Sequence, residues 1–209
     1  MDGADRRVHR VARRHDASHA VGNGGSRIGR ADLGLSVTVV VAGRTAPNRA
    51  VRFGGEHGEL DRRGRLDVAG LTVPDAVGFR VGPETSVAQT AEILGVASDP
   101  DPSLSTLDVG RWRGQSPEAV AADLPLWFGD PNARPHGGET VREFVARIDA
   151  ALAEAADGDV LIVASPVAQA LLCESAERYF AVDVRPASVL TVRHRNCRTR
   201  VPRCRYESG

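Results

Sequence analysis

The sequence of 209 residues contains no lysine, a single methionine and only 4% aromatic residues. Apart from histidine, every basic side chain is arginine. With abundant Ala, Gly, Val and Asp, this is typical of a GC-rich, bacterial genome and is not by itself a sign of phosphate binding. The 27 basic residues are balanced by 27 acidic ones. A net charge of zero excludes a general attraction to nucleic acid or to an anionic membrane, so we expect neither as a partner.

Cysteine is also scarce, and Cys173, Cys197 and Cys204 form no CxxC pair and no Cys/His zinc spacing. We therefore expect no metal and no cofactor. Free thiols are the favoured interpretation, with Cys197 facing Cys204 across a hairpin as the alternative. No apolar run approaches the roughly 20 residues of a membrane helix, and the basic N-terminal segment lacks the apolar core of a secretory signal. These features predict a cytoplasmic protein.

Residues 1–34 are rich in Arg, His, Gly and Ser and contain little apolar material. We predict a disordered or loosely attached basic arm, with a nucleic-acid-binding helix over residues 5–15 as the alternative. Residues 35–209 are long enough for one α/β domain with its own buried core.

Apolar and β-branched runs over residues 35–42, 76–82 and 159–165 predict strands, the first and last buried on both faces. Helical spacing occurs over 65–73, closed by Pro74, and over 86–95, 137–158 and 166–180. Segments 187–195 and 197–206 read as terminal strands of a hairpin around Asn196. This alternation predicts an α/β fold with a mainly parallel sheet and helices on both faces.

Individual residues give weak indications of chemistry. No segment has the GxGxxG or GxxxxGK[ST] pattern of a phosphate-binding loop. Ser165 lies where a strand meets a helix, but "VASPV" is no GxSxG elbow, so we interpret it as a helix cap, with a serine nucleophile as the alternative. His57 and His136 lie in predicted loops, where a solvated side chain is favoured over a catalytic one.

Taken in order, several blocks between residues 37 and 195 resemble the histidine phosphatase superfamily, also called phosphoglycerate-mutase-like. "VVVAGRTAPNRAVRFGG" resembles the first strand and RHGETxxN turn, and "GPETSVAQTAEILG" resembles SPxxRAxQTAE. "LSTLDVGRWRGQSPEAV" resembles LxExDxGxWEG, and "RPHGGETVREFVARID" resembles the PxGES helix start. "VLIVASPVAQALL" resembles the strand and turn that carry the family's second histidine.

The resemblance implies a three-layer α/β sandwich and a phosphohistidine mechanism. In the family one histidine attacks phosphorus, two arginines and a second histidine bind the phosphoryl group, and a carboxylate protonates the leaving group. Such chemistry needs preorganised cations around the phosphoryl oxygens and a neutral imidazole as nucleophile.

The family's catalytic positions are occupied here by other residues. Thr45 and Asn48 match the end of the RHGETxxN turn and set the register. The arginine and the nucleophilic histidine of that turn, the second arginine, the acid and the second histidine then fall on Val41, Ala42, Ser86, Thr106 and Ser165. The last alignment needs a one-residue gap, so Ala164 is the alternative to Ser165.

None of these replacements can perform the family's chemistry, and we expect no phosphohistidine mechanism. The favoured interpretation is a pseudoenzyme or ligand-binding domain that binds a small molecule or a protein partner. The alternative is a repurposed enzyme of specialised metabolism, and the second alternative a weak residual phosphatase that uses His57 or His136. The sequence gives no oligomeric state.

The expected pocket is polar and nearly neutral, and suits an uncharged or weakly anionic molecule. An open cavity with convergent polar groups would favour a repurposed site over an inert one. An Arg44 guanidinium that points into it would favour an anion, and one that points to solvent would not. The expected lining residues are Arg44, Thr45, Asn48, Ser86, Thr106 and Ser165.

Overall fold

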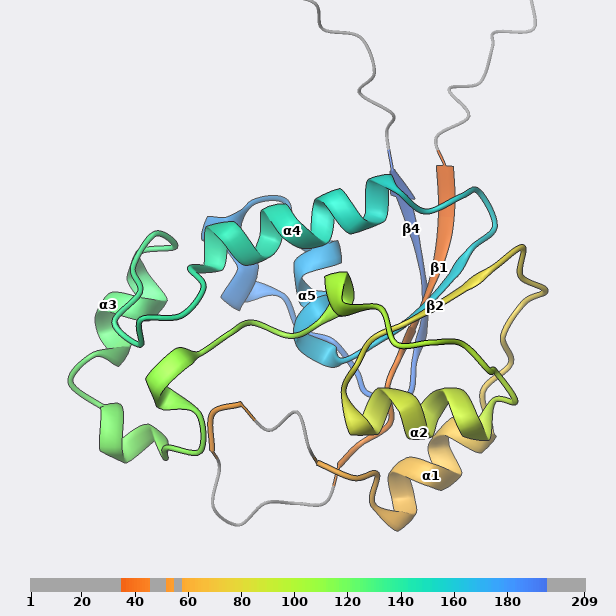
Figure 1. Cartoon of the computed structure of the whole chain (residues 1–209), viewed down its shortest axis with the longest axis horizontal. Coiled ribbons are helices and arrows are strands. Elements are labelled where there is room, and N and C mark those ends of the chain that lie inside the picture. Colours follow the sequence, from red (N-terminus) through yellow and green to blue (C-terminus); the bar gives the residue numbers. More distant parts are fainter. Residues whose placement is uncertain (1–34, 46–51, 55–57, 195–209) are drawn as a thin grey trace, which may run out of the picture. The chain divides into compact units, whose positions relative to one another are not determined.

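The computed structural model describes residues 35–45, 52–54 and 58–194, and its centre is a four-stranded sheet in the order β2-β3-β1-β4 (Figure 1). Strand β1 (Leu35–Val41) pairs in parallel with β3 (Val160–Val163), and β3 pairs in parallel with β2 (Phe79–Val81). Strand β4 (Val189–His194) runs antiparallel along the other side of β1. The predicted mainly parallel sheet is therefore confirmed, with one antiparallel edge strand.

Helices cover both faces of this sheet. They are α1 (Arg62–Ala69), α2 (Thr85–Ile93), α3 (Leu124–Gly129), α4 (Val141–Ala153) and α5 (Ser165–Leu172), with short 3-10 turns η1 (Pro102–Leu104), η2 (Gly110–Trp112), η3 (Pro117–Val120) and η4 (Ala176–Ala181). Alternate residues of β1 enter two separate cores. Val39 packs with α4 and α5, whereas Val40 packs with α2, on which α1 lies. The α/β fold with helices on both faces is thus confirmed.

Helix α4 forms because its sequence satisfies both its first turn and its buried face. Thr140 and Glu143 make a reciprocal capping box at the N-terminus. The predicted apolar stripe is buried along its whole length, at Val141, Phe144, Val145, Ile148 and Leu152. The helix ends at Ala153 and not at Gly158, whose φ of +84° serves a later turn.

Two other helix ends differ from the sequence-based prediction. Helix α1 starts at the Asp61 cap and ends at Gly70, four residues before Pro74. The predicted helix 166–180 is broken because Cys173 is extended, with a ψ of 140°, so α5 and η4 are separate elements. The β-strand predicted over 76–82 is shorter than expected, and only Phe79–Val81 form β2.

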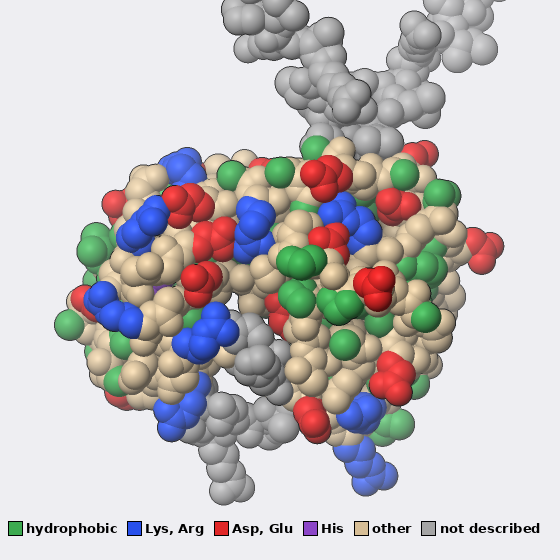
Figure 2. All heavy atoms as spheres, in the orientation of Figure 1, with side chains coloured by type: hydrophobic (Ala, Val, Ile, Leu, Met, Phe, Trp, Pro, Cys, Tyr) green, Lys and Arg blue, Asp and Glu red, His purple; other side chains and the backbone are tan. Residues whose placement is uncertain are grey.

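Several predictions fall on residues outside the described ranges, including the arm over 1–34, the strand over 197–206, and Asn48 and His57. On the face in Figure 2, acidic and basic side chains are interspersed. Among the helices that are described, none has the length and hydrophobicity required to cross a bilayer.

Candidate functional site

A cavity of about 430 Å³ lies at the carboxyl ends of the three parallel strands. Its walls include residues that follow β1, β2 and β3, namely Ala42 to Thr45, Glu84 and Ser86, and Ala164 to Pro166. The carboxyl edge of a parallel sheet is where α/β proteins place their ligand sites. The volume also falls within the range of about 300–1,000 Å³ that is usual for small-molecule pockets.

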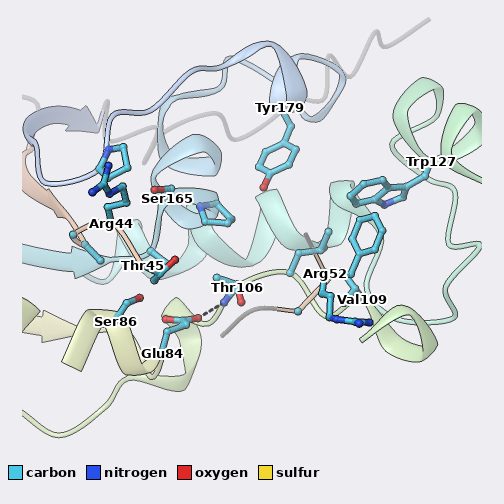
Figure 3. Close-up of a pocket in the computed structure, with 18 residues that line it drawn as sticks. Arg44, Thr45, Arg52, Glu84, Ser86, Thr106, Val109, Trp127, Ser165 and Tyr179 are labelled. Carbon is cyan, nitrogen blue, oxygen red and sulfur yellow. Dashed lines mark hydrogen bonds between the residues drawn. The ribbon is translucent and has the colours of Figure 1, made fainter. Parts of the chain in front are cut away.

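Most of the positions identified from the family resemblance meet in this cavity (Figure 3). Ala42, Ser86, Thr106 and Ser165 all line it, although they come from four separate segments of the chain. Val41 does not, because its side chain is fully buried in the core beneath α4 and α5. The alternative position Ala164 also lines the cavity, so the structure brings both candidates for the second histidine position to the site.

Arg44 and Thr45 line the cavity as well, whereas Asn48 lies outside the described ranges. The Arg44 Nε donates a hydrogen bond of 2.9 Å to Oδ2 of Asp61, and 55% of the Arg44 side chain is exposed. The Arg44 charge is therefore paired and largely solvated, which does not favour an anionic ligand.

Hydrogen bonds from α2 fix the turn that follows β1. Thr90 Oγ1 accepts a bond of 3.1 Å from the Gly43 N–H and donates one of 2.7 Å to the Ser86 carbonyl. Gln89 Oε1 accepts a bond of 2.8 Å from the Leu60 N–H. Since Gln89 and Thr90 are among the residues that match the family motif, the motif's supporting part keeps a structural role in this chain.

The cavity also holds a carboxylate that the sequence analysis missed. Glu84, the N-cap residue of α2, is only 4% exposed. Its Oε1 accepts a hydrogen bond of 2.6 Å from the Thr106 N–H (Figure 3). Its Oε2 is buried and has no hydrogen-bond partner among the described residues. The buried acidic side chain of Glu84 and the exposed guanidiniums of Arg44 and Arg52 thus all belong to the described lining. The position of Glu84 just after a parallel strand was the available signal.

Aromatic side chains form another part of the wall, with Phe53, Trp127 and Tyr179 all lining the cavity. The Trp127 ring meets Phe53 edge-on at 5.7 Å, and its buried Nε1 has no partner within the described part of the chain. The Tyr179 hydroxyl is directed toward the cavity in Figure 3. Burial, and secondarily the nearby Cys173, raise the pKa of Tyr179, so this hydroxyl is a neutral group.

Ser165 is not the helix cap that the sequence suggested. The N-cap of α5 is Ala164, which has no polar side chain, and Ser165 is the first helical residue. Within residues 35–45, 52–54 and 58–194, no hydrogen bond joins Ser165 to a histidine or a carboxylate. An activated serine needs such a base, so this arrangement does not support a serine nucleophile.

His136 is buried, with 1% of its surface exposed, so the expectation of a solvated side chain is wrong. Its Nδ1 accepts a hydrogen bond of 3.0 Å from the Gly138 N–H, and its ring packs edge-on against Trp112 at 5.1 Å. Burial lowers its pKa, partly opposed by the charge of Asp108. His136 is not among the cavity-lining residues, so the structure gives it a packing role.

No group of three or more His, Cys, Asp or Glu side chains that could hold a metal ion occurs in the part of the chain that the structure describes. The described lining of the cavity accordingly offers one buried carboxylate, two exposed guanidiniums, several hydroxyl groups and an aromatic wall.

The chain is similar in sequence to one known protein family. The model of the histidine phosphatase superfamily (branch 1) matches residues 79–206. The match begins after residues 37–55, where the first family block had been recognised. None of the curated proteins has significant sequence similarity to the chain.

Solved structures of similar fold include a mycobacterial glucosyl-3-phosphoglycerate phosphatase, with 21% identity and a TM-score of 0.61 over 75% of this chain and 89% of that one. The TTHB049 protein of Thermus thermophilus has 23% identity and a TM-score of 0.60 over 76% and 92% of the two chains. The Rv3214 protein of Mycobacterium tuberculosis has 21% identity and a TM-score of 0.60 over 77% and 94%. At these identities the likeness concerns the fold.

Proposed function

Because the chain belongs to the histidine phosphatase superfamily (branch 1), we propose that its cavity is a small-molecule binding site that lacks the family's phosphohistidine chemistry. One observation carries this proposal. Ala42, Ser86, Thr106 and Ser165 line an open cavity of about 430 Å³ at the place where the resemblance puts the catalytic groups.

The side chains at these positions argue against phosphoryl transfer. The methyl group of Ala42 cannot attack phosphorus, and loss of a covalent nucleophile removes that pathway. Ser86 brings no positive charge, and removal of one preorganised donor typically costs about 10²–10³ in rate. In the described part of the lining, the positive charge that a phosphate ester needs comes only from Arg44 and Arg52, which are exposed and bound to other groups. A phosphate ester is the kind of substrate that the name of the mycobacterial neighbour implies for that protein.

The same features favour a binding site over an inert remnant. The cavity is not filled by the surrounding side chains, and polar groups from separate segments meet in it beside an aromatic wall. Pockets that orient small molecules combine a mostly apolar lining with a few convergent polar groups. The open cavity thus supports ligand binding more strongly than a role confined to protein contacts.

A repurposed enzyme is the second candidate, and the presence of Glu84 and Tyr179 in one cavity favours it. A buried carboxylate can accept a proton, and a neutral phenol can donate a hydrogen bond to a developing negative charge. Such a pair could serve an isomerisation, cyclisation, dehydration or hydrolysis of a small molecule in specialised metabolism. Turnover of a bound molecule, lost in Glu84→Gln with binding retained, would distinguish this candidate from a binding domain.

A blocking variant tests the proposal. Thr106→Phe places a large ring in the cavity, whereas Thr191→Phe makes the same exchange at an exposed position on β4. We expect small molecules that shift the NMR spectrum or raise the Tm of the wild type to act equally on Thr191→Phe and not on Thr106→Phe. Hydrolysis of p-nitrophenyl phosphate with an acid-labile phosphoenzyme would overturn the proposal. Ligand binding that Thr106→Phe leaves unchanged would also overturn the proposal. A broad metabolite panel without any binder would overturn it as well and would favour a protein partner.

A further inference from the structure

We infer that the cavity selects a small organic cation, a protonated amine with an apolar body, through the carboxylate of Glu84. This inference rests on the proposed ligand-binding function and specifies the ligand class. Its starting point is a buried acidic side chain in a cavity where the family resemblance implies cationic groups.

The cavity wall contains a buried acidic side chain with few partners. Glu84 is 4% exposed, and none of the ion pairs found in the described ranges includes it. Only its Oε1 has a partner, the Thr106 N–H, and Oε2 has none among the described residues. A buried carboxylate with so few partners is costly, and a ligand that brings a positive charge and N–H donors removes that cost.

Two arginines also line the cavity, and both are bound to groups other than Glu84. Arg44 is bound to Asp61, and the exposed Arg52 donates a hydrogen bond of 2.7 Å to the Gly114 carbonyl. In Figure 3 neither guanidinium is directed at the Glu84 carboxylate. Both side chains are exposed, where solvent and salt screen their charge. Within the described lining, Glu84 is therefore the buried member of the three acidic or basic side chains, and both arginines are exposed.

The Glu84 carboxylate is bound by a loop that is itself fixed. The loop that donates to it is fixed by Arg147, which gives hydrogen bonds of 2.8 Å to the Ser103 carbonyl and 3.0 Å to the Ser105 carbonyl. On the other side, a Cβ at Gly82 would lie 2.9 Å from Glu84 Oε2, so glycine there leaves room for the carboxylate. A carboxylate that is bound by a fixed loop is preorganised for a ligand and loses little freedom on binding.

An aromatic wall lies in the same cavity as the carboxylate. Phe53, Trp127 and Tyr179 line the same cavity as Glu84. Aromatic faces attract cations and also bury the apolar body that carries them. A carboxylate together with aromatic faces matches an ammonium group on an apolar skeleton better than it matches a neutral alcohol or a carboxylic acid.

The residues at the family's catalytic positions differ in charge from the groups that the resemblance implies. The family's two arginine positions hold Val41 and Ser86 and its second-histidine position holds Ser165, none of which carries a charge, while a carboxylate lies near the position assigned to the family's acid. That carboxylate now comes from Glu84 at the start of α2 and is bound by the backbone of Thr106. Loss of the cations with retention of a buried anion converts an anion site into a cation site.

Three probes of similar shape test the inference, namely benzylamine, benzyl alcohol and benzoate, with inorganic phosphate as a fourth. We expect benzylamine to bind the wild type at least tenfold more tightly than benzyl alcohol, as measured by calorimetry or NMR titration at pH 7 and low salt. Glu84→Gln should reduce this preference to less than twofold. Glu92→Gln, an exposed residue of the same helix, should leave it unchanged.

Glu84→Gln keeps an oxygen that can accept from Thr106, and Glu84→Asp, which keeps the charge, should retain part of the preference. If either variant does not fold, the comparison of amine with alcohol on the wild type still decides the question. Equal or tighter binding of the alcohol, benzoate or phosphate would overturn the inference. If that binding is blocked by Thr106→Phe, the proposed function stands; if none of the probes or metabolites binds, both fail.

Discussion

The backbone N–H of Gly43 donates a hydrogen bond of 3.1 Å to the Oγ1 of Thr90, which is fully buried. This bond joins the turn after β1 to α2 and so connects two walls of the cavity. The pair lies 47 residues apart in the sequence. One buried hydroxyl group therefore links two segments that both contribute residues to the cavity wall.

We expect Thr90→Val to destabilise the protein by about 1–3 kcal/mol, because it keeps the shape of the side chain and leaves the Gly43 N–H buried without a partner. Urea unfolding measures the effect. Thr191→Val, at an exposed position of β4, is the matched control and should change the free energy of unfolding by less than about 0.5 kcal/mol. Equal effects of the two substitutions would contradict the assigned role of Thr90.

Gly64 allows α1 to approach the turn after β1. A Cβ added there would lie 2.1 Å from the Arg44 carbonyl oxygen, and backbone atoms cannot yield cheaply. We expect Gly64→Ala to lower the free energy of unfolding by about 1–3 kcal/mol or more. At Gly129, the last residue of α3, a Cβ would have no neighbour within 4 Å. Gly129→Ala should be neutral or stabilise by up to about 1 kcal/mol. A tolerated Gly64→Ala would show that the contact is looser than described.

The buried His136 should make stability depend on pH between about 5 and 7. Burial holds the pKa of this histidine below its ordinary value of 6.5, so the unfolded chain binds the proton before the folded one does. As pH falls through 6.5, the free energy of unfolding should therefore decrease, by at most about 1.4 kcal/mol per pH unit. His136→Phe should flatten this dependence in urea unfolding curves measured across the range.

The carboxyl group of Glu143 affects the free energy of unfolding in a separate, lower pH range. The Thr140 N–H holds the pKa of Glu143 below its ordinary value of 4.5, so the stabilisation linked to Glu143 is lost only at lower pH. The comparison of wild type with His136→Phe between pH 5 and 7 is consequently specific to histidine. An unchanged slope in the variant would assign the effect to another group.

Arg147 should control the order of the loop that binds Glu84. Its guanidinium pairs with Glu139 at 2.8 Å and bonds to the loop carbonyls. We expect Arg147→Met to accelerate hydrogen exchange at the Thr106 amide at least tenfold, since that amide is protected by its bond to Glu84. Arg63→Met breaks only an exposed i,i+4 pair with Asp67 and should leave this exchange unchanged. Similar exchange in both variants would exclude the positioning role of Arg147.

The sequence by itself determined which segments form the core elements. The β-branched run of residues 35–42 predicts β1, and the stripe on α4 predicts its buried face, because both signals are local and periodic. The order of the family blocks likewise indicated the family, which the model match over residues 79–206 supports. Helix ends were predicted less well, since Gly70 and the extended Cys173 end helices at points that periodicity does not mark.

Only the tertiary structure decided which acidic and basic side chains share the site. Parallel pairing of β1, β2 and β3 brings their carboxyl ends together, so residues distant in sequence share one cavity. The sequence places Glu84 just after a predicted strand, but it could not reveal that Glu84 is buried there or that His136 is buried elsewhere, since burial depends on which segments pack above a residue. The sequence thus predicted which residues occupy the family's catalytic positions, and long-range packing determined that Glu84 is buried beside them.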